Sequence, residues 1–167
     1  MSSAGGSSEE RLYAYLDSLG IEYIRHSHPA VYTVEEAQQH CAHIEGAHCK
    51  NLLLKNKGGG RCYLLVMENT KKADLKSLAR QLEEKKLALA SPQRVQEYLG
   101  LEPGAVSPFG LINDLRREVI VLLDRDLKEA DYINFHPNVN TATLTIKVED
   151  FYRFLEERGN SVREIEW

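Results

Sequence analysis

The residue types most able to carry out chemistry gather in one short stretch of the sequence. His40, Cys41, His43, His48 and Cys49 lie within ten residues, and imidazole and thiolate groups are common zinc ligands. Structural zinc sites pair their ligands at short, regular spacings. Here the two cysteines are eight positions apart, and no second pair of matching spacing follows. We therefore expect no metal and no other cofactor, and interpret these residues as parts of a helix end and a loop.

Three other segments place polar side chains beside glycine or proline. Lys50 and Asn51 open a predicted buried strand, where a lysine must reach outward or face a cleft. Gly104 to Pro108 belongs to a stiff loop with apolar residues, and His136 to Asn140 surrounds a proline at a predicted strand end. Taken singly, these segments are better explained as a strand edge, a tight turn and a capped asparagine turn.

Familiar catalytic motifs are missing from the sequence. The glycines at 58–60 lack the spacing of a nucleotide-binding loop. No Gly-x-Ser-x-Gly motif is present, and no spacing selects one Cys–His pair as catalytic. Motifs and composition alone therefore indicate a soluble α+β domain and assign no activity.

Several helices are marked by the residues at their starts. Ser7 and Thr33 each precede a glutamate by three positions, which predicts two capping boxes. Asp74 and Ser91 are predicted to cap two further helices. Apolar residues within 148–155 predict the apolar face of a last helix.

Strands are predicted from runs of apolar and β-branched residues. Residues 50–55 and 61–67 flank a glycine-rich loop and predict a β-hairpin. Residues 102–110 are too rich in proline and glycine for either regular state. Further strands are expected at 21–26, 87–90, 119–123, 133–135 and 141–146.

Length and composition predict one globular domain. The 167 residues are 43% hydrophobic and 28% charged, close to globular averages. The apolar runs are far shorter than the roughly 20 residues that span a bilayer, and residues 1–8 read as a flexible tail without signal-peptide features. Three cysteines cannot all pair within one chain, so free thiols in a reducing cytoplasm are expected.

Charge is distributed unevenly along the chain. The net charge is −4, but residues 50–86 hold ten Lys or Arg against four acids, so this segment is cationic on an acidic body. The overall charge argues against a general nucleic-acid or DNA binder. The cationic segment could meet a polyanion locally, although lysine-rich solvated faces are the commoner explanation.

Taken together, the three polar segments resemble an aminoacyl-tRNA editing family. This is the YbaK/ProX family, related to the insertion domain of bacterial prolyl-tRNA synthetase, and the free-standing ProXp-ala type is the most similar. The matching stretches are 31–37, 46–54, 103–114 and 135–143. The resemblance implies a single α+β domain over residues 9–167, with a mixed, mostly antiparallel sheet surrounded by helices.

The resemblance also implies an activity and its residues. Members hydrolyse the ester that joins a wrong amino acid to a tRNA, and the ProXp-ala type removes alanine from tRNA for proline. By this likeness Lys50 holds the phosphate or ribose of the terminal adenosine, and His136 positions water or the ribose. Assistance from the ribose 2′-hydroxyl makes a metal or a strong protein nucleophile unnecessary. The implied substrate-binding residues are Asn51, Gly104, Pro108, Phe109, Asn138, Asn140, Val31 and Tyr32. Of these, the apolar Val31, Tyr32 and Phe109 are expected to form the pocket wall that excludes proline.

The expected partners follow from this likeness. Lys71, Lys72 and Lys76 are predicted to meet acceptor-stem phosphates, and a prolyl-tRNA synthetase is a further candidate partner. Two alternatives stay open: a deacylase for cysteinyl- or another small aminoacyl-tRNA, and a non-catalytic module that binds tRNA or a synthetase. For Cys49, packing is favoured over a direct role.

Overall fold

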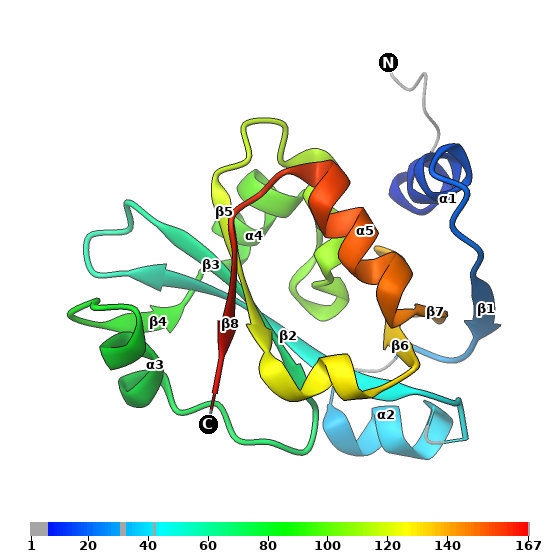
Figure 1. Ribbon diagram of the computed structural model, residues 1–167, viewed down its shortest axis with the longest axis horizontal. Helices are drawn as coiled ribbons and strands as arrows, with labels where there is room; N and C mark the ends of the chain where they lie inside the picture. Colours follow the sequence, from blue (N-terminus) through cyan, green and yellow to red (C-terminus); the bar gives the residue numbers. More distant parts are fainter. Residues whose placement is uncertain (1–6, 31–32, 42, 167) are drawn as a thin grey trace.

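The computed structural model describes residues 7–30, 33–41 and 43–166, which form one mixed sheet with helices around it (Figure 1). The α-helices are α1 (Ser8–Ser18), α2 (Val34–Cys41), α3 (Leu75–Gln81), α4 (Pro92–Leu99) and α5 (Val148–Arg158). The strands are β1 (Ile24–Ser27), β2 (Ala47–Asn56), β3 (Cys62–Glu68), β4 (Leu87–Leu89), β5 (Val119–Asp124), β6 (Tyr132–Phe135), β7 (Ala142–Lys147) and β8 (Val162–Ile165). The short 3₁₀ helices are η1 (Pro103–Ala105), η2 (Pro108–Asn113) and η3 (Arg125–Glu129).

The sheet confirms the predicted α+β class. Its strand order is β1-β7-β6-β2-β3-β5-β8, and β4 pairs with β2 outside this path. Four strand pairs are antiparallel, while β2–β6, β3–β5 and β5–β8 are parallel. The β2–β3 hairpin projects toward one end of the molecule, and β6 and β7 lie toward the other (Figure 1).

The predicted helix starts are confirmed by their side-chain caps. Ser7 accepts a hydrogen bond from the Glu10 N–H, and Asp74 and Ser91 cap α3 and α4 in the same way. Each such bond satisfies a backbone donor that the first helical turn leaves unpaired. Because α1 begins at Ser8, the helix starts inside the span expected to be tail, and residues 1–6 lie outside the described residues.

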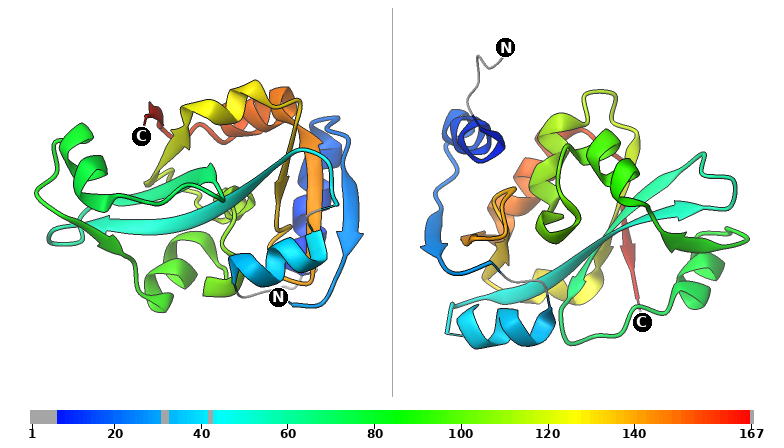
Figure 2. Two further views of the ribbon diagram at one scale, coloured as in Figure 1. Left: turned by 90° about the horizontal axis from the view of Figure 1, so that it is seen from below. Right: turned by 180° about the vertical axis from the view of Figure 1, so that it is seen from behind.

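Successive side chains of the central strands point to opposite faces of the sheet and form two apolar cores. Leu64 and Val66 of β3 belong to one cluster, which the apolar faces of α1, α4 and α5 complete. Leu65 and Met67 belong to the other cluster, which α3 covers. Helices accordingly lie on both sides of the sheet (Figure 2). Within the described residues, no helix is both long enough and apolar enough to cross a bilayer.

The structure differs from the expectations at three places. Residues 102–110 were expected to be irregular, but they contain η1 and the start of η2, because Pro103 and Pro108 fit the first turn of a short helix. The 3₁₀ helix η3 and the strand β8 were not expected. Three of the four β8 residues are exposed, so the strand lacks the apolar run that would mark it in the sequence.

Candidate active site

Lys50 and His136 lie just beyond the short stretch in which strands β2 and β6 pair. The two strands pair in parallel through Ala47↔Ile133 and His48↔Asn134. Lys50 and His136 each follow the second pair by two positions, where the two strands have ceased to pair and β6 has ended at Phe135. Two residues along a strand return to the same face, and both residues are half-buried.

A fixed turn holds this register. The Asn134 side-chain amide donates to the carbonyls of Glu45 at 2.9 Å and Ala47 at 3.1 Å. The Thr145 hydroxyl donates to Asn134 Oδ1. Gly46 has a φ of 105°, and a Cβ at this position would lie 2.7 Å from the Tyr132 carbonyl oxygen. The turn therefore requires glycine for both conformation and space.

The hydrogen bonding of His136 determines which ring nitrogen is available. Nδ1 lies 3.0 Å from the Ala142 carbonyl oxygen, and a carbonyl only accepts, so Nδ1 carries the proton. Burial lowers the pKa of His136, the Ala142 bond partly opposes this, and His28 lowers the pKa further. The ring is therefore neutral near pH 7, and Nε2 keeps a lone pair that can accept a hydrogen bond.

A second histidine lies beside His136 and was not predicted. The ring centroids of His28 and His136 are 6.2 Å apart. His28 Nδ1 donates to the Pro29 carbonyl at 2.8 Å, so in the neutral ring Nε2 accepts from the Thr143 hydroxyl, also at 2.8 Å. Cys41, the last residue of α2, approaches the same hydroxyl at 3.7 Å. No local pattern in the sequence marks this contact, because it joins residues more than 100 positions apart.

The loop after β6 carries a buried amide. Asn138 is 6% exposed and adopts a φ of 65°, a left-handed conformation that asparagine tolerates. Among the described residues, neither polar atom of its side-chain amide has a hydrogen-bond partner. A buried amide without partners is costly, so Asn138 is suited to bind a ligand. Asn140, also predicted to bind substrate, is half-buried in the same loop.

Asn51 lies on the opposite face of β2 from Lys50. It pairs with Val66 of the first core cluster, whereas Lys50 pairs with Met67 of the second. The side chain of Asn51 is half-buried, and its Oδ1 is buried without a partner in the described part of the chain. The side chains of Lys50 and Asn51 therefore lie on opposite faces of strand β2.

The predicted glycine–proline loop is ordered around a buried serine. Ser107 Oγ accepts a hydrogen bond from the Phe109 N–H at 3.1 Å. Gly104 is half-buried and Pro108 is buried. Phe109 is fully buried and meets Phe135 and Phe154 edge-on at centroid distances of 5.6 and 5.4 Å.

The burial of Phe109 changes its expected role. It was predicted to form a wall of the substrate pocket, but a side chain with no exposed surface has no face left for a substrate. Its contact with Phe135 instead supports the strand end that carries His136. Val31 and Tyr32, the other expected wall residues, lie outside the described residues.

The three lysines predicted to bind tRNA differ in their surroundings. Lys71 Nζ contacts Asp124 at 2.8 Å and Asp126 at 2.6 Å. Burial lowers the pKa of Lys71, but the two carboxylates outweigh it and raise the pKa overall. Its charge is thus already paired, which leaves the exposed Lys72 and Lys76 better suited to meet phosphates.

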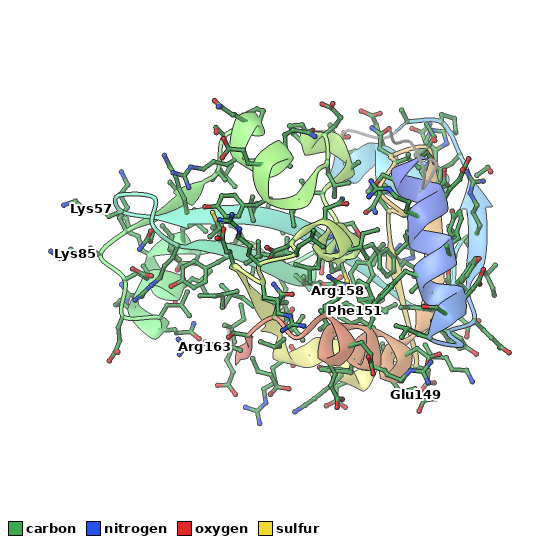
Figure 3. The ribbon with its side chains drawn as sticks, turned by 90° about the horizontal axis from the view of Figure 1, so that it is seen from above. Lys57, Lys85, Glu149, Phe151, Arg158 and Arg163 are labelled. Carbon is green, nitrogen blue, oxygen red and sulfur yellow. The ribbon has the colours of Figure 1, made fainter. Side chains whose placement is uncertain are left out.

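A further cationic set lies at the opposite end from β6 and β7. Lys57, at the tip of the β2–β3 hairpin, and Lys85 both lie at this end of the molecule (Figure 3).

The histidine–cysteine stretch is engaged in structural contacts. His48 Nε2 donates to the Ile44 carbonyl at 2.8 Å, and Cys41, Cys49 and Cys62 are free thiols, as expected. Burial, reinforced by the charges of Glu68 and Asp124, raises the pKa of Cys49. Its thiol is therefore protonated, which does not suit a nucleophile. Within the described ranges, no group of three or more His, Cys, Asp or Glu is arranged to hold a metal.

Comparisons with known proteins identify the family. A family model described as "Aminoacyl-tRNA editing domain" matches residues 28–154. The "Prolyl-tRNA editing protein ProX" of Acetoanaerobium sticklandii is 38% identical over 95% of this chain and 97% of its own length. The "Multifunctional Ser/Thr-tRNA deacylase ProXp-y" of Escherichia coli K12 is 28% identical over 91% and 90%.

A solved structure supports the fold independently. The crystal structure of hypothetical protein APE2540 superposes with a TM-score of 0.71 over 92% of this chain and 97% of that chain, at 20% identity. The family match covers Lys50, Asn51, the Gly104–Pro108 loop and His136. The chain therefore belongs to the aminoacyl-tRNA editing domain family of the YbaK/ProX type, whose members are aminoacyl-tRNA deacylases.

Proposed function

We propose that this deacylase hydrolyses the ester of alanine mischarged to tRNA for proline. It acts in trans in the cytoplasm, without a metal, with the prolyl-tRNA synthetase as a candidate partner. The observation that carries the proposal is the neutral His136, whose Nδ1 is bound to Ala142 and whose Nε2 can accept, and which lies, like Lys50, just beyond the β2–β6 pairing. The likeness to a prolyl-tRNA editing protein supports tRNA for proline as the carrier.

The chemistry needs positioning more than a strong nucleophile. An aminoacyl ester is activated, and the vicinal 2′-hydroxyl of the ribose can assist its hydrolysis. Nε2 of His136 accepts a hydrogen bond from the attacking water or that hydroxyl. The Lys50 ammonium holds a phosphate or ribose oxygen of the terminal adenosine. The water oxygen forms the new bond to the carbonyl carbon, and the ribose 3′-oxygen leaves.

Polar groups near the ester stabilise the developing charge. Backbone N–H groups of the Gly104–Pro108 loop are candidates to stabilise the oxyanion. The buried amide of Asn138 has donors and an acceptor without partners among the described residues, so it can bind the ribose.

A separate proofreading site is needed because the selectivity of the synthetase pocket is limited. A pocket built for proline cannot strongly exclude the smaller alanine, because each missing methylene is worth only about 1–3 kcal/mol. A second site that excludes proline by bulk can remove the error. Cysteinyl and other small aminoacyl groups are the competing substrates, and the named activity of the Escherichia coli relative makes seryl-tRNA a necessary comparison.

One assay separates these substrates. Deacylation is measured with alanyl-, cysteinyl-, seryl- and prolyl-tRNA for proline, with and without prolonged chelation. We expect alanyl-tRNA to have the highest kcat/KM, prolyl-tRNA to be spared, and chelation to have no effect. A ratio of alanyl to prolyl kcat/KM near one would refute alanine-specific editing. Binding of tRNA without turnover of any ester would favour the non-catalytic module.

A further inference from the structure

Strand β2 has one edge that is unpaired over a short stretch beside the candidate site. Cys49 to Leu53 pair with β3 on one side. On the other side, pairing with β6 ends at His48 and pairing with β4 begins at Leu54. Among the described residues, no strand therefore pairs with 49–53 along this edge.

The direction of the main-chain groups follows from three hydrogen bonds. The Asn69 N–H donates to the His48 carbonyl, and the Asn56 N–H donates to the Arg61 carbonyl, so even-numbered residues of β2 face β3. The Ala90 N–H donates to the Leu53 carbonyl on the opposite side, so odd-numbered residues face the open edge. The N–H and the carbonyl of Asn51 therefore both point to this edge, where no described strand pairs with Asn51.

An α-aminoacyl ester has the groups that match this edge. In an extended residue the N–H and the carbonyl point to the same side, and two such residues exchange both hydrogen bonds in an antiparallel pair. The ammonium nitrogen and the ester carbonyl oxygen of an aminoacyl-tRNA have the same relation across one α-carbon. Asn51 is half-buried, so its edge excludes part of the solvent, and hydrogen bonds from a charged donor are the stronger ones.

We propose that the main chain of Asn51 binds the aminoacyl group as a one-residue strand. The ammonium donates to the Asn51 carbonyl, and the Asn51 N–H donates to the ester carbonyl oxygen. Lys50 lies on one face of this edge and Asn51 Oδ1 on the other. The main chain thus recognises the α-amino group, whereas the polar side chains around the site bind the ribose and water. The inference rests on the proposed deacylase function.

The first test changes the substrate and leaves the protein intact. Alanyl- and lactyl-tRNA for proline are compared, because lactate replaces the ammonium with a neutral hydroxyl. Each rate is divided by the spontaneous hydrolysis rate of the same ester. We expect the corrected kcat/KM to fall at least about tenfold for the lactyl ester. Equal corrected values would overturn the inference, while no turnover of alanyl-tRNA would refute the proposed function instead.

The second test separates main chain from side chain. In Asn51→Ala the side chain is lost and both backbone groups remain, so the alanyl-to-lactyl ratio should stay within about twofold of the wild-type ratio. If this ratio fell toward one, the side-chain amide of Asn51 would be the group that recognises the ammonium, and the inference would be overturned.

Asn51→Pro additionally removes the N–H, which faces the unpaired edge and so is not needed by the β2–β3 ladder. Its kcat should be at least about tenfold below that of Asn51→Ala, with circular dichroism confirming the fold. Equal kcat values in two folded variants would exclude the N–H as a ligand of the ester. If the proline variant does not fold, the lactyl comparison decides alone.

Discussion

Replacing His136 by asparagine or by glutamine separates its two ring nitrogens. An asparagine amide can reach the position of Nδ1 and keep the hydrogen bond to the Ala142 carbonyl, but it has no group at Nε2. A glutamine amide extends to the position of Nε2 but leaves the carbonyl without its donor. His136→Asn should therefore be the more stable of the two variants, and His136→Gln should be the more active one.

The expected magnitudes follow from these contacts. Loss of the Ala142 bond in His136→Gln should lower the free energy of unfolding by about 1 kcal/mol, whereas His136→Asn should change it less. A positioned proton acceptor is worth roughly 10²–10⁴-fold in rate, so kcat for alanyl-tRNA should fall at least about 100-fold in His136→Asn. The glutamine of His136→Gln can still accept a hydrogen bond from water, so kcat should fall less in this variant.

The pH profile of the wild-type enzyme provides an independent measurement. Burial, which dominates, lowers the pKa of His136, so Nε2 is unprotonated above this pKa and activity is retained there. As the pH falls through the lowered pKa, below the ordinary value of about 6.5, protonation removes the lone pair and kcat should decline. The decline should be absent in His136→Asn. Deacylation by a folded His136→Asn protein within about threefold of wild type would refute this assignment.

Three further changes test other parts of the site. Lys50→Ala should lower kcat/KM for alanyl-tRNA at least about tenfold with little change in melting temperature, and unchanged turnover would remove Lys50 from the site. Gly46→Ala should lower the free energy of unfolding by about 2 kcal/mol or more through backbone strain and the contact with the Tyr132 carbonyl, whereas Gly60→Ala, whose Cβ would meet nothing within 4 Å, should be near neutral in denaturant titrations. Neutralising Lys72 and Lys76 together should flatten the salt dependence of tRNA binding, and an unchanged slope would mean that these lysines only face solvent.

Local signals in the sequence predicted the elements well. The capping residues Ser7, Asp74 and Ser91 act through hydrogen bonds that span only three positions, so they can be read from short segments. The β2–β3 hairpin was predictable for the same reason, since its two strands are neighbours in the chain. Lys50 and His136 were singled out through a family resemblance and not through spacing, and their roles in the site stay predictions.

Contacts between distant segments could not be read in this way. The parallel register of β2 and β6 joins residues more than 80 positions apart, and no local pattern specifies it. Phe109 was predicted to bind substrate because its burial depends on Phe135 and Phe154, which are distant in the sequence. Lys71 appeared to be free because Asp124 approaches it from another strand.

The strand order has a consequence for how the chain folds. The first strand, β1, and the last strand, β8, form the two edges of the sheet path, and among the described strands β1 pairs only with β7. The N-terminal strand thus has no partner until more than 140 residues have been synthesised. Such non-local pairing raises the contact order and slows folding. A ribosome-bound chain that ends before β7 would expose an unpaired edge at β1 and lack Ala142, whose carbonyl orients His136, so the nascent protein can acquire deacylase activity only late in its synthesis.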